Sequence, residues 1–395
     1  MSNLNATPSA NRLHIGIFGR RNAGKSSIIN ALTGQDLAIV SDVQGTTTDP
    51  VLKAMELLPL GPVVLIDTPG LDDEGTLGAL RVKKAFQMLN KTDIAVLVVD
   101  ASGGLTEKDR EILRKIQEKE IPYVIAYNKC DMTPLSSAAE ENVIHVSAAT
   151  GKNIHQLKEL IARCAVTENI DKKIVGDLLS PGDFVILVVP IDSAAPKGRL
   201  ILPQQQTIRD ILDSGAIAVT VRDTELEDTL RRLGRQPALV ITDSQVFEQA
   251  AAVTPPGIPL TSFSILFARY KGDLKILTEG AAMLDQLKEN DTVLISEGCT
   301  HHRQCNDIGT VKLPNWIQKH TGKQLRFAFT SGTQFPDDLS PYQLVIHCGG
   351  CMLNDREMKY RLRCAKDQGI PITNYGTAIA HMKGILKRST SIFSI

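Results

Sequence analysis

Short apolar segments alternate with amphipathic stretches over the first 165 residues of the chain. The apolar segments have the length of buried strands, and the amphipathic stretches repeat apolar residues every three to four positions, which is the period of a helix. Strands that alternate with helices predict an α/β fold whose mainly parallel sheet is covered on both faces. The expected strands are Leu13–Phe18, Val63–Asp67, Ile94–Asp100, Tyr123–Tyr127 and Val143–Val146; the expected helices are Ser26–Leu32, Leu77–Leu89, Glu107–Glu118 and Ile154–Cys164.

The same alternation restarts twice after this segment. A polar stretch at 167–173 and a Ser-Pro-Gly turn at 180–182 end the first segment, and a proline-rich stretch at 255–259 ends the second. The second segment has strands and helices but no motif with a recognisable chemistry. We therefore expect an α/β domain followed by two smaller α/β domains with mainly parallel sheets, at residues 1–170, 180–261 and 262–395.

Composition and charge exclude several classes of protein. The 395 residues carry 44 basic and 44 acidic side chains, which argues against a protein held to nucleic acid by bulk phosphate attraction. No apolar run approaches the roughly 20 residues that a bilayer-spanning helix needs. The first twelve residues are polar and unlike a signal peptide, so we expect a cytoplasmic protein with no membrane contact and no nucleic-acid partner.

A phosphate-binding loop lies between the first expected strand and helix. Residues 19–26 read GRRNAGKS and fit the pattern G-x-x-x-x-G-K-[ST]. In such a loop backbone N–H groups wrap the phosphates, the lysine reaches the β- and γ-phosphates, and the serine hydroxyl binds Mg²⁺. The expected nucleotide-binding residues are Gly19, Asn22, Ala23, Gly24, Lys25, Ser26 and Ser27, with Lys25 also catalytic.

Three further motifs at strand ends indicate that the nucleotide is GTP. Residues 67–70 read DTPG, where Asp67 belongs near Mg²⁺ and Gly70 senses the γ-phosphate. Residues 128–131 read NKCD, and a carboxylate at Asp131 can accept both the N1–H and the exocyclic amine of guanine. The loop at 147–149 can offer a backbone amide to the guanine oxygen. The expected guanine-binding residues are Asn128, Lys129, Asp131, Ser147, Ala148 and Ala149.

The segment GTTTD at 45–49 lies where a GTPase places a switch. It resembles the small GTPases of the Era and TrmE type, and the resemblance implies that Thr47 completes the Mg²⁺ ligands together with Ser26. Leu71 follows DTPG where Ras-like enzymes have a water-orienting glutamine, so we expect slow intrinsic hydrolysis. Asn22 occupies the position at which related GTPases help to hold K⁺ near the phosphates, and we therefore expect catalysis to depend on Asn22, Thr47 and Gly70 as well as Lys25.

A second candidate site lies in the last segment, where five of the seven cysteines fall between residues 299 and 364. Cys299 and His301 follow one expected strand; His347, Cys348 and Cys351 follow another. If these strands are parallel neighbours, both loops meet at the carboxyl edge of the sheet. Three cysteines can hold three irons of a 4Fe–4S cluster and leave the fourth iron to a histidine, His301 or His347, or to an exchangeable ligand. Three cysteines and one histidine can also hold a structural zinc. Spacing alone leaves iron–sulfur, zinc and no metal open.

The combination of a GTPase head with C-x-H and H-C-x-x-C resembles the maturation GTPases of FeFe-hydrogenases, the HydF family. The resemblance covers the full length, including CTHHRQCNDIG at 299–309 and VIHCGGC at 345–351. It implies a dimerisation domain in the middle and a 4Fe–4S cluster ligated by Cys299, Cys348 and Cys351, with His301 and His347 nearby. It also implies a scaffold that receives a diiron precursor from two radical-SAM maturases and delivers it to apo FeFe-hydrogenase.

A second hypothesis comes from the head alone. An Era-like GTPase associated with the ribosome or with tRNA could carry a zinc module at its C-terminal end. The neutral net charge and the lack of a basic appended domain disfavour this alternative. Because symmetric homodimers are the commonest oligomers, we expect the middle domain to pair two copies of the chain.

Overall fold

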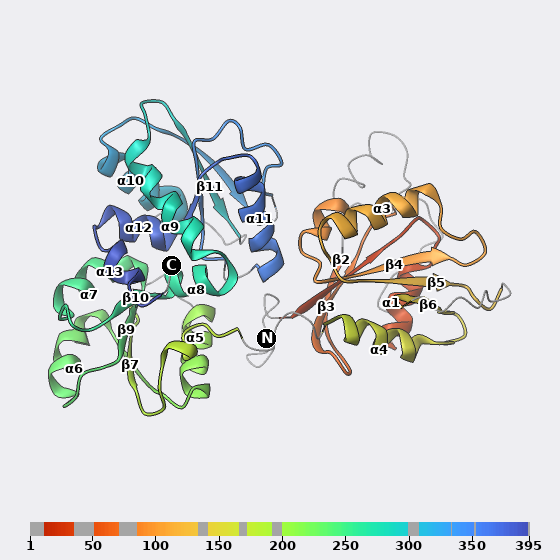
Figure 1. The fold of residues 1–395 in the computed structure, drawn as a ribbon, viewed down its shortest axis with the longest axis horizontal. Coiled ribbons are helices and arrows are strands. Elements are labelled where there is room, and N and C mark those ends of the chain that lie inside the picture. Colours follow the sequence, from red (N-terminus) through yellow and green to blue (C-terminus); the bar gives the residue numbers. More distant parts are fainter. Residues whose placement is uncertain are drawn as a thin grey trace. The chain divides into compact units, whose positions relative to one another are not determined.

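The computed structural model describes residues 12–34, 51–70, 85–132, 141–165, 172–191, 200–298, 308–332, 334–350 and 353–393. The chain forms two compact units, Met1–Ile170 and Asp171–Ile395 (Figure 1). The division between them falls in the polar stretch at 167–173. In the described parts no helix combines the length and the apolar character that a membrane crossing requires.

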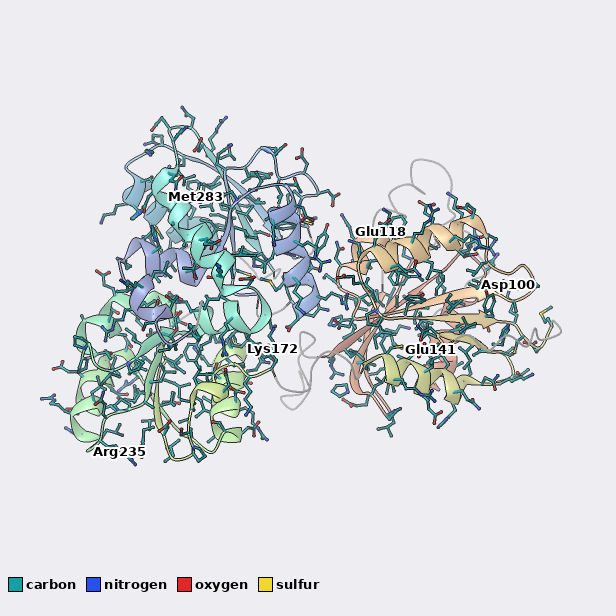
Figure 2. All side chains as sticks on the ribbon, viewed as in Figure 1. Asp100, Glu118, Glu141, Lys172, Arg235 and Met283 are labelled. Atoms are coloured by element: carbon teal, nitrogen blue, oxygen red, sulfur yellow. The ribbon has the colours of Figure 1, made fainter. Side chains whose placement is uncertain are left out.

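The first unit is built on a six-stranded sheet with the order β2-β3-β1-β4-β5-β6. All neighbours are parallel except β2, which pairs antiparallel with β3. Parallel strands connected by helices end at the same edge, which Asp100 at the end of β4 marks in Figure 2. The strands are β1 (Leu13–Phe18), β2 (Val51–Leu57), β3 (Gly61–Asp67), β4 (Ile94–Asp100), β5 (Tyr123–Asn128) and β6 (Val143–His145).

Helices cover both faces of this sheet. Alternate residues of β4 contribute to different cores: Val96 and Val98 pack with α1 (Lys25–Thr33) and α4 (Ile154–Ala165), and Leu97 and Val99 pack with α3 (Glu107–Glu118) and residues 85–89. α3 begins at a reciprocal capping box, in which Thr106 and Asp109 satisfy backbone N–H groups of the first turn. Burial on both faces explains why these strands are continuously apolar.

The second unit contains two four-stranded sheets, and every strand pair in them is parallel. The first sheet has the order β10-β9-β7-β8 and the second the order β12-β11-β13-β14. The strands of the first are β7 (Phe184–Val188), β8 (Ile217–Val221), β9 (Leu239–Thr242) and β10 (Leu260–Ser262). Those of the second are β11 (Thr292–Glu297), β12 (Arg326–Ser331), β13 (Leu344–His347) and β14 (Ile372–Asn374).

One apolar core joins the two sheets. Val185 and Ile241 of the first sheet belong to the same buried cluster as Leu294 and Val345 of the second. Helix α8 (Phe263–Lys271) lies in this core, with most of its residues buried. The other helices are α5 (Leu202–Asp213), α6 (Leu226–Arg232), α7 (Phe247–Val253), α9 (Leu274–Ala282), α10 (Leu313–Thr321), α11 (Asp355–Asp367), α12 (Tyr375–Met382) and α13 (Leu386–Thr390).

The structure confirms the expected α/β class with mainly parallel sheets and adds elements that the sequence analysis did not anticipate. The additions include the antiparallel β2, the short β10, the buried α8 and the short α13. The expected division at 261/262 falls inside β10, because this strand completes the first sheet of the second unit. The expected helix Leu77–Leu89 lies partly outside the described residues.

Candidate functional site

The GRRNAGKS segment forms a tight loop between β1 and α1. The Lys25 ammonium is buried and donates to the carbonyl oxygens of Gly19 at 3.0 Å and Arg20 at 2.8 Å. Asn22 has a φ of 60° and is exposed at the tip of the loop, and Gly24 precedes the helix with a φ of 93°. The loop therefore wraps its own lysine and presents the N-terminus of α1, the arrangement that binds phosphates.

The two fixed glycines of the motif are required by space as well as by conformation. A Cβ on Gly19 would lie 2.3 Å from the carbonyl oxygen of Val98 in β4. A Cβ on Gly24 would lie 2.1 Å from Nδ2 of Asn128. The loop thus packs directly against the neighbouring strand ends, and any side chain at these positions would push it away from them.

Ser26 and Asp67 face each other; both are expected near Mg²⁺ and both belong to the described part of the chain. Ser26, in the first turn of α1, donates from Oγ to Oδ2 of Asp67 over 3.2 Å. Burial raises the pKa of Asp67, and the positive charge of Lys25 opposes this shift. A half-buried carboxylate beside a hydroxyl is a suitable environment for a divalent cation, which would favour the ionised form. Gly70 follows β3, and Thr47 and Leu71 lie outside the described residues.

Asn128 ties three of the expected nucleotide-binding segments together. Its Nδ2 donates to the carbonyl oxygen of Ala23 over 3.1 Å, and its Oδ1 accepts from the backbone N–H of Ala148 over 3.0 Å. The phosphate loop, the NKCD segment and the 147–149 loop are therefore joined through one buried amide. Asn128 therefore holds these three segments in register with one another.

Asp131 follows Asn128 in the same NKCD segment. Its carboxylate is exposed, and a hydrogen bond from Ser147 holds its pKa below the ordinary value. An ionised, accessible carboxylate can accept the two N–H groups that guanine offers. Ser147 is fully buried and also accepts from the backbone N–H of Thr150, so it fixes the loop that ends in Ala148 and the exposed Ala149.

Two charged pairs near this site were not anticipated. Lys129 donates to Asp100 over 2.6 Å. Burial raises the pKa of Asp100, but hydrogen bonds from Lys129 and Ser102 outweigh this effect and lower the pKa to about 2. Arg20 lies 3.1 Å from the fully buried Asp109 of the α3 capping box. The position of Asp100 at a strand end could have indicated the pair with Lys129. The local sequence around Arg20 gives no indication of its pair with Asp109.

The second candidate site lies at the carboxyl edge of the sheet formed by β11–β14. β11 and β13 are parallel neighbours, as the expected convergence of the two cysteine loops required, with Ser296 in register with His347. The N–H of Cys348 continues this ladder by donating to the carbonyl oxygen of Ser296 over 3.0 Å. Of the expected metal ligands, His347 and Cys348 are described, and Cys299, His301 and Cys351 lie outside the described residues.

The Cys348 sulfur lies in a small nest of backbone donors. Its Sγ accepts from the N–H of Gly298 over 3.0 Å and from the N–H of Gly350 over 3.4 Å. Gly298 directly precedes Cys299, so this bond connects the two cysteine loops. Backbone N–H groups stabilise a thiolate relative to a thiol, because they favour the negative charge. The arrangement fits a cysteine that acts as a metal ligand.

His347 is placed differently from the expectation of a metal ligand. It is fully buried; Nδ1 lies 2.6 Å from the carbonyl oxygen of Cys348, and Nε2 lies 2.8 Å from Nη1 of Arg361. Because a guanidinium only donates, Nε2 accepts and the proton resides on Nδ1. Burial, together with the charge of Arg361, lowers the pKa of His347 to about 3. Both ring nitrogens are therefore engaged in protein contacts, and iron ligation would require Arg361 to move.

Two buried basic residues hold the two ends of the cysteine loop: Arg361 contacts His347, and Lys271 contacts Leu353. The sequence analysis did not single them out. Arg361 is fully buried and also bonds Glu357, Ser296 and the carbonyl oxygen of Gly332. Lys271, at the end of α8, donates to the carbonyl oxygen of Leu353 over 2.7 Å. A usable signal for Arg361 was its position one turn after Glu357, among the apolar residues of α11 (Asp355–Asp367). The sequence around Lys271 lacks such a signal.

Three family models match the chain in succession. Residues 14–129 match the model described as 50S ribosome-binding GTPase. Residues 174–272 match the Hydrogen maturase F dimerization domain, and residues 275–392 match the Hydrogen maturase F tetramerization domain.

Individual relatives match the head. The tRNA modification GTPase MnmE of Legionella pneumophila (strain Corby) is 35% identical over 177 residues, which are 44% of this chain and 37% of that protein. GTPase Der of Maridesulfovibrio salexigens is 39% identical over 140 residues, 34% of this chain and 30% of that protein. The chain thus spans about a third of the length of these relatives. The structure of Aquifex aeolicus Era bound to GDP and AlF4⁻ matches 56% of this chain and 98% of Era, with 19% identity and a TM-score of 0.35.

The phosphate loop, the guanine motifs and the matched head define a P-loop GTPase domain, for which GTP and Mg²⁺ are the ligands. Two further α/β domains follow it in the chain, each with a parallel sheet of its own. Since both of these domains match hydrogen maturase F models, the chain is a HydF-type hydrogenase maturation GTPase that contains a dimerisation domain.

Proposed function

We propose that this protein is a GTP-hydrolysing scaffold and carrier in the assembly of the FeFe-hydrogenase active site. It holds a 4Fe–4S cluster, binds a diiron precursor made by two radical-SAM maturases, and delivers that precursor to apo FeFe-hydrogenase. The observation that carries the proposal is the hydrogen-bonded Cys348 sulfur, which joins the loop after β11 to the loop after β13. The HydF-type domains support the same assignment.

The residues at the carboxyl edge of this sheet fit a cluster of this kind. Cys348 has the donor environment of a thiolate, and Cys299 and Cys351 supply the other two sulfurs. A 4Fe–4S cluster held by three cysteines keeps one iron that can take an exchangeable ligand, which is the chemistry a carrier needs. The protein contributes the rest: Arg361 and His347 fix the start of the loop, and Lys271 fixes its end.

The GTPase head would regulate this cycle. Hydrolysis depends on Lys25 and on the Mg²⁺ ligands Ser26 and Thr47, with K⁺ held beside Asn22 as the extra positive charge. The cluster-binding domain holds the cargo, and the middle domain pairs two chains into a homodimer. The head thus hydrolyses GTP, the domain matched at 174–272 dimerises, and the domain matched at 275–392 binds the cluster.

Anaerobic reconstitution with iron and sulfide tests the proposal. We expect the wild-type protein to bind about four irons and four sulfides per chain, to show the broad visible absorption of thiolate-bound iron, and to allow activation of apo-hydrogenase by the two maturases. Cys348→Ala is expected to lose most of the iron and all activation. Cys364→Ala is the matched control, since Cys364 lies on α11 in the same domain and outside the two cysteine loops.

The alternative of a zinc-containing, ribosome- or tRNA-associated GTPase gives a different result. A colourless protein that retains zinc and binds no iron or sulfide after reconstitution would contradict the proposal. GTP hydrolysis is expected in both cases, so the iron and sulfide content and the activation assay decide between them.

A further inference from the structure

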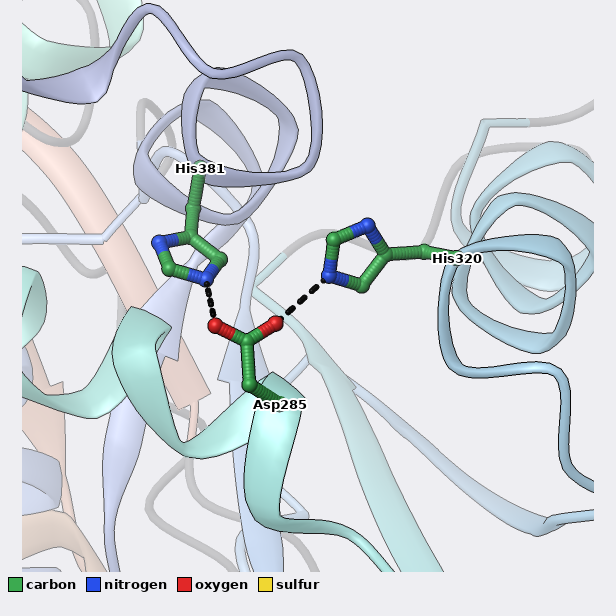
Figure 3. Close-up of side chains that lie close together, drawn as sticks. All are labelled: Asp285, His320 and His381. Carbon is green, nitrogen blue, oxygen red and sulfur yellow. Dashed lines mark hydrogen bonds and ion pairs between the residues drawn. The ribbon is translucent and has the colours of Figure 1, made fainter.

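Three potential metal ligands that belong to neither site described above lie close together in the last domain. Asp285 lies between two histidines: Oδ1 is 2.7 Å from Nε2 of His320, and Oδ2 is 2.9 Å from Nε2 of His381 (Figure 3). One ligand atom from each side chain lies within 4.8 Å of the other two. Among the described residues this is a compact group of two imidazoles and one carboxylate, a donor set typical of borderline divalent metals.

The three side chains come from three different elements of the last domain. Asp285 belongs to the 3-10 turn η5 (Met283–Gln286) that follows α9, His320 lies in the last turn of α10, and His381 lies in the last turn of α12. Helix C-termini carry partial negative charge, so two helix ends and a carboxylate together favour a cation at this point. In Figure 3 both imidazoles point toward the carboxylate.

The group is separate from the cysteine loops. η5 leads into β11 and α10 leads into β12, so Asp285 and His320 lie toward the amino ends of these parallel strands. The cysteine loops follow the carboxyl ends of β11 and β13. The two groups of ligands are thus at opposite edges of the same sheet, and one metal cannot bridge them.

Exposure and spacing suit an ion that enters from solvent. The side chains of His320 and His381 are 25% and 20% exposed, and that of Asp285 is 56% exposed. Metal bonds of about 2.0–2.1 Å place tetrahedral ligand atoms roughly 3.3 Å apart. Side-chain rotations that move the ligand atoms by about 1 Å would bring the nitrogens to that spacing. Each imidazole would then carry its proton on Nδ1.

We propose that Asp285, His320 and His381 form a binding site for a divalent metal ion, with Zn²⁺ the best-suited occupant and water in the remaining position. The ion fastens η5, α10 and α12 to one another on one face of the β11–β14 sheet. Its role is structural or regulatory for this domain and does not depend on the iron–sulfur cluster. The alternative is a surface ion pair, in which the carboxylate only accepts hydrogen bonds from two imidazoles.

Cobalt titration is the sharpest test, because Co²⁺ reports its own ligands in the visible spectrum. The full-length protein is titrated in the presence of saturating Mg²⁺ and GDP, in a background carrying Cys299→Ser, Cys348→Ser and Cys351→Ser. We expect one equivalent to bind with micromolar affinity and to give visible cobalt bands without sulfur charge transfer. His381→Gln and Asp285→Asn are each expected to weaken binding at least tenfold.

A control variant and a thermal measurement show whether metal binding belongs to the proposed site. His155→Gln removes a histidine that pairs with an acid on the surface of α4 and is expected to leave binding unchanged. In the chain with all its cysteines, Zn²⁺ should raise the thermal midpoint, and the part of this rise that His381→Gln abolishes belongs to the proposed site. Equal cobalt affinity in the triple-serine background with and without His381→Gln, or binding only at millimolar concentration, would overturn the proposal and leave a surface ion pair.

Discussion

Arg361 donates from Nη1 to Nε2 of His347 over 2.8 Å, beneath the loop that carries Cys348. The same guanidinium bonds the carboxylate of Glu357, the hydroxyl of Ser296 and a backbone carbonyl, and all of these side chains are buried. A buried charge is stable only when the groups around it supply its ion pair and its hydrogen bonds. The pair therefore fixes where β13 ends and how the cysteine loop leaves the sheet.

Arg361→Met is expected to destabilise the protein by about 3–5 kcal/mol, because it leaves the Glu357 carboxylate buried without its cation. The double variant Arg361→Met with Glu357→Leu should recover part of this loss, since the stranded charge is removed as well. Urea unfolding monitored by circular dichroism measures both. Arg363→Met, at an exposed position of the same helix, should change the free energy of unfolding by no more than about 0.5 kcal/mol.

Much of the nucleotide site could be predicted because its information is local. Each motif combines a strand end with residues whose chemistry is fixed by short spacing, as at Lys25, Asp67 and Asp131. The expectation that the strands leading into the two cysteine loops are parallel neighbours is confirmed, with Ser296 and His347 in register.

The remaining features depend on long-range packing. Charged residues such as Lys271 and Arg361 normally lie at the surface, so their burial beneath the cysteine loop follows only from contacts distant in the sequence. The expected ligand role of His347 came from its place beside Cys348, whereas its ring nitrogens are directed to a carbonyl and a guanidinium. Strand β2 was missed because its apolar residues are largely exposed.

Asp131→Asn is expected to change nucleotide preference. The wild-type carboxylate should favour GTP over ATP by at least about 100-fold, since the wrong base leaves it without its two donors. The asparagine variant should lose much of the affinity for GTP and bind xanthine nucleotides better, because an amide can pair with the changed base edge. Fluorescence titration with GTP, ATP and XTP measures this, and equal affinity of the wild-type protein for GTP and ATP would contradict the guanine assignment.

Potassium is expected to accelerate GTP hydrolysis relative to sodium. Asn22 is exposed at the tip of the phosphate loop, and Leu71 replaces the water-orienting glutamine of Ras-like enzymes. Steady-state rates at matched ionic strength should differ about fivefold or more, equivalent to about 1 kcal/mol in the barrier. Asn22→Ala should abolish the difference. Equal wild-type rates in the two salts would exclude a potassium role.

The middle domain is expected to pair two chains through the edge of its sheet. β8 is one of the two outer strands in the described order β10-β9-β7-β8, and Ile217 on it is 42% exposed. An outer strand offers backbone groups to a second copy. Ile217→Lys should shift the mass measured by light scattering at micromolar concentration from dimer toward monomer. Leu212→Lys, at an exposed position of α5, is the control; a strictly monomeric wild-type protein would refute dimerisation.

His347 provides the last prediction, which separates positioning from ligation. Gln can accept from Arg361 through its oxygen and donate to the Cys348 carbonyl through its nitrogen, but an amide is a poor ligand for iron. If His347 positions the loop, His347→Gln should keep nearly all reconstituted iron and an unchanged paramagnetic spectrum.

His347→Ala, by contrast, should leave Arg361 without one partner, lower the free energy of unfolding and impair hydrogenase activation. Cys348→Ala should lose the cluster itself, and GTP hydrolysis should survive in all three variants, because the nucleotide motifs belong to the separate first unit. A nitrogen coupling in the wild-type spectrum that disappears in His347→Gln would contradict this view. The imidazole would then bind iron, and Arg361 would have to release it when the cluster is inserted.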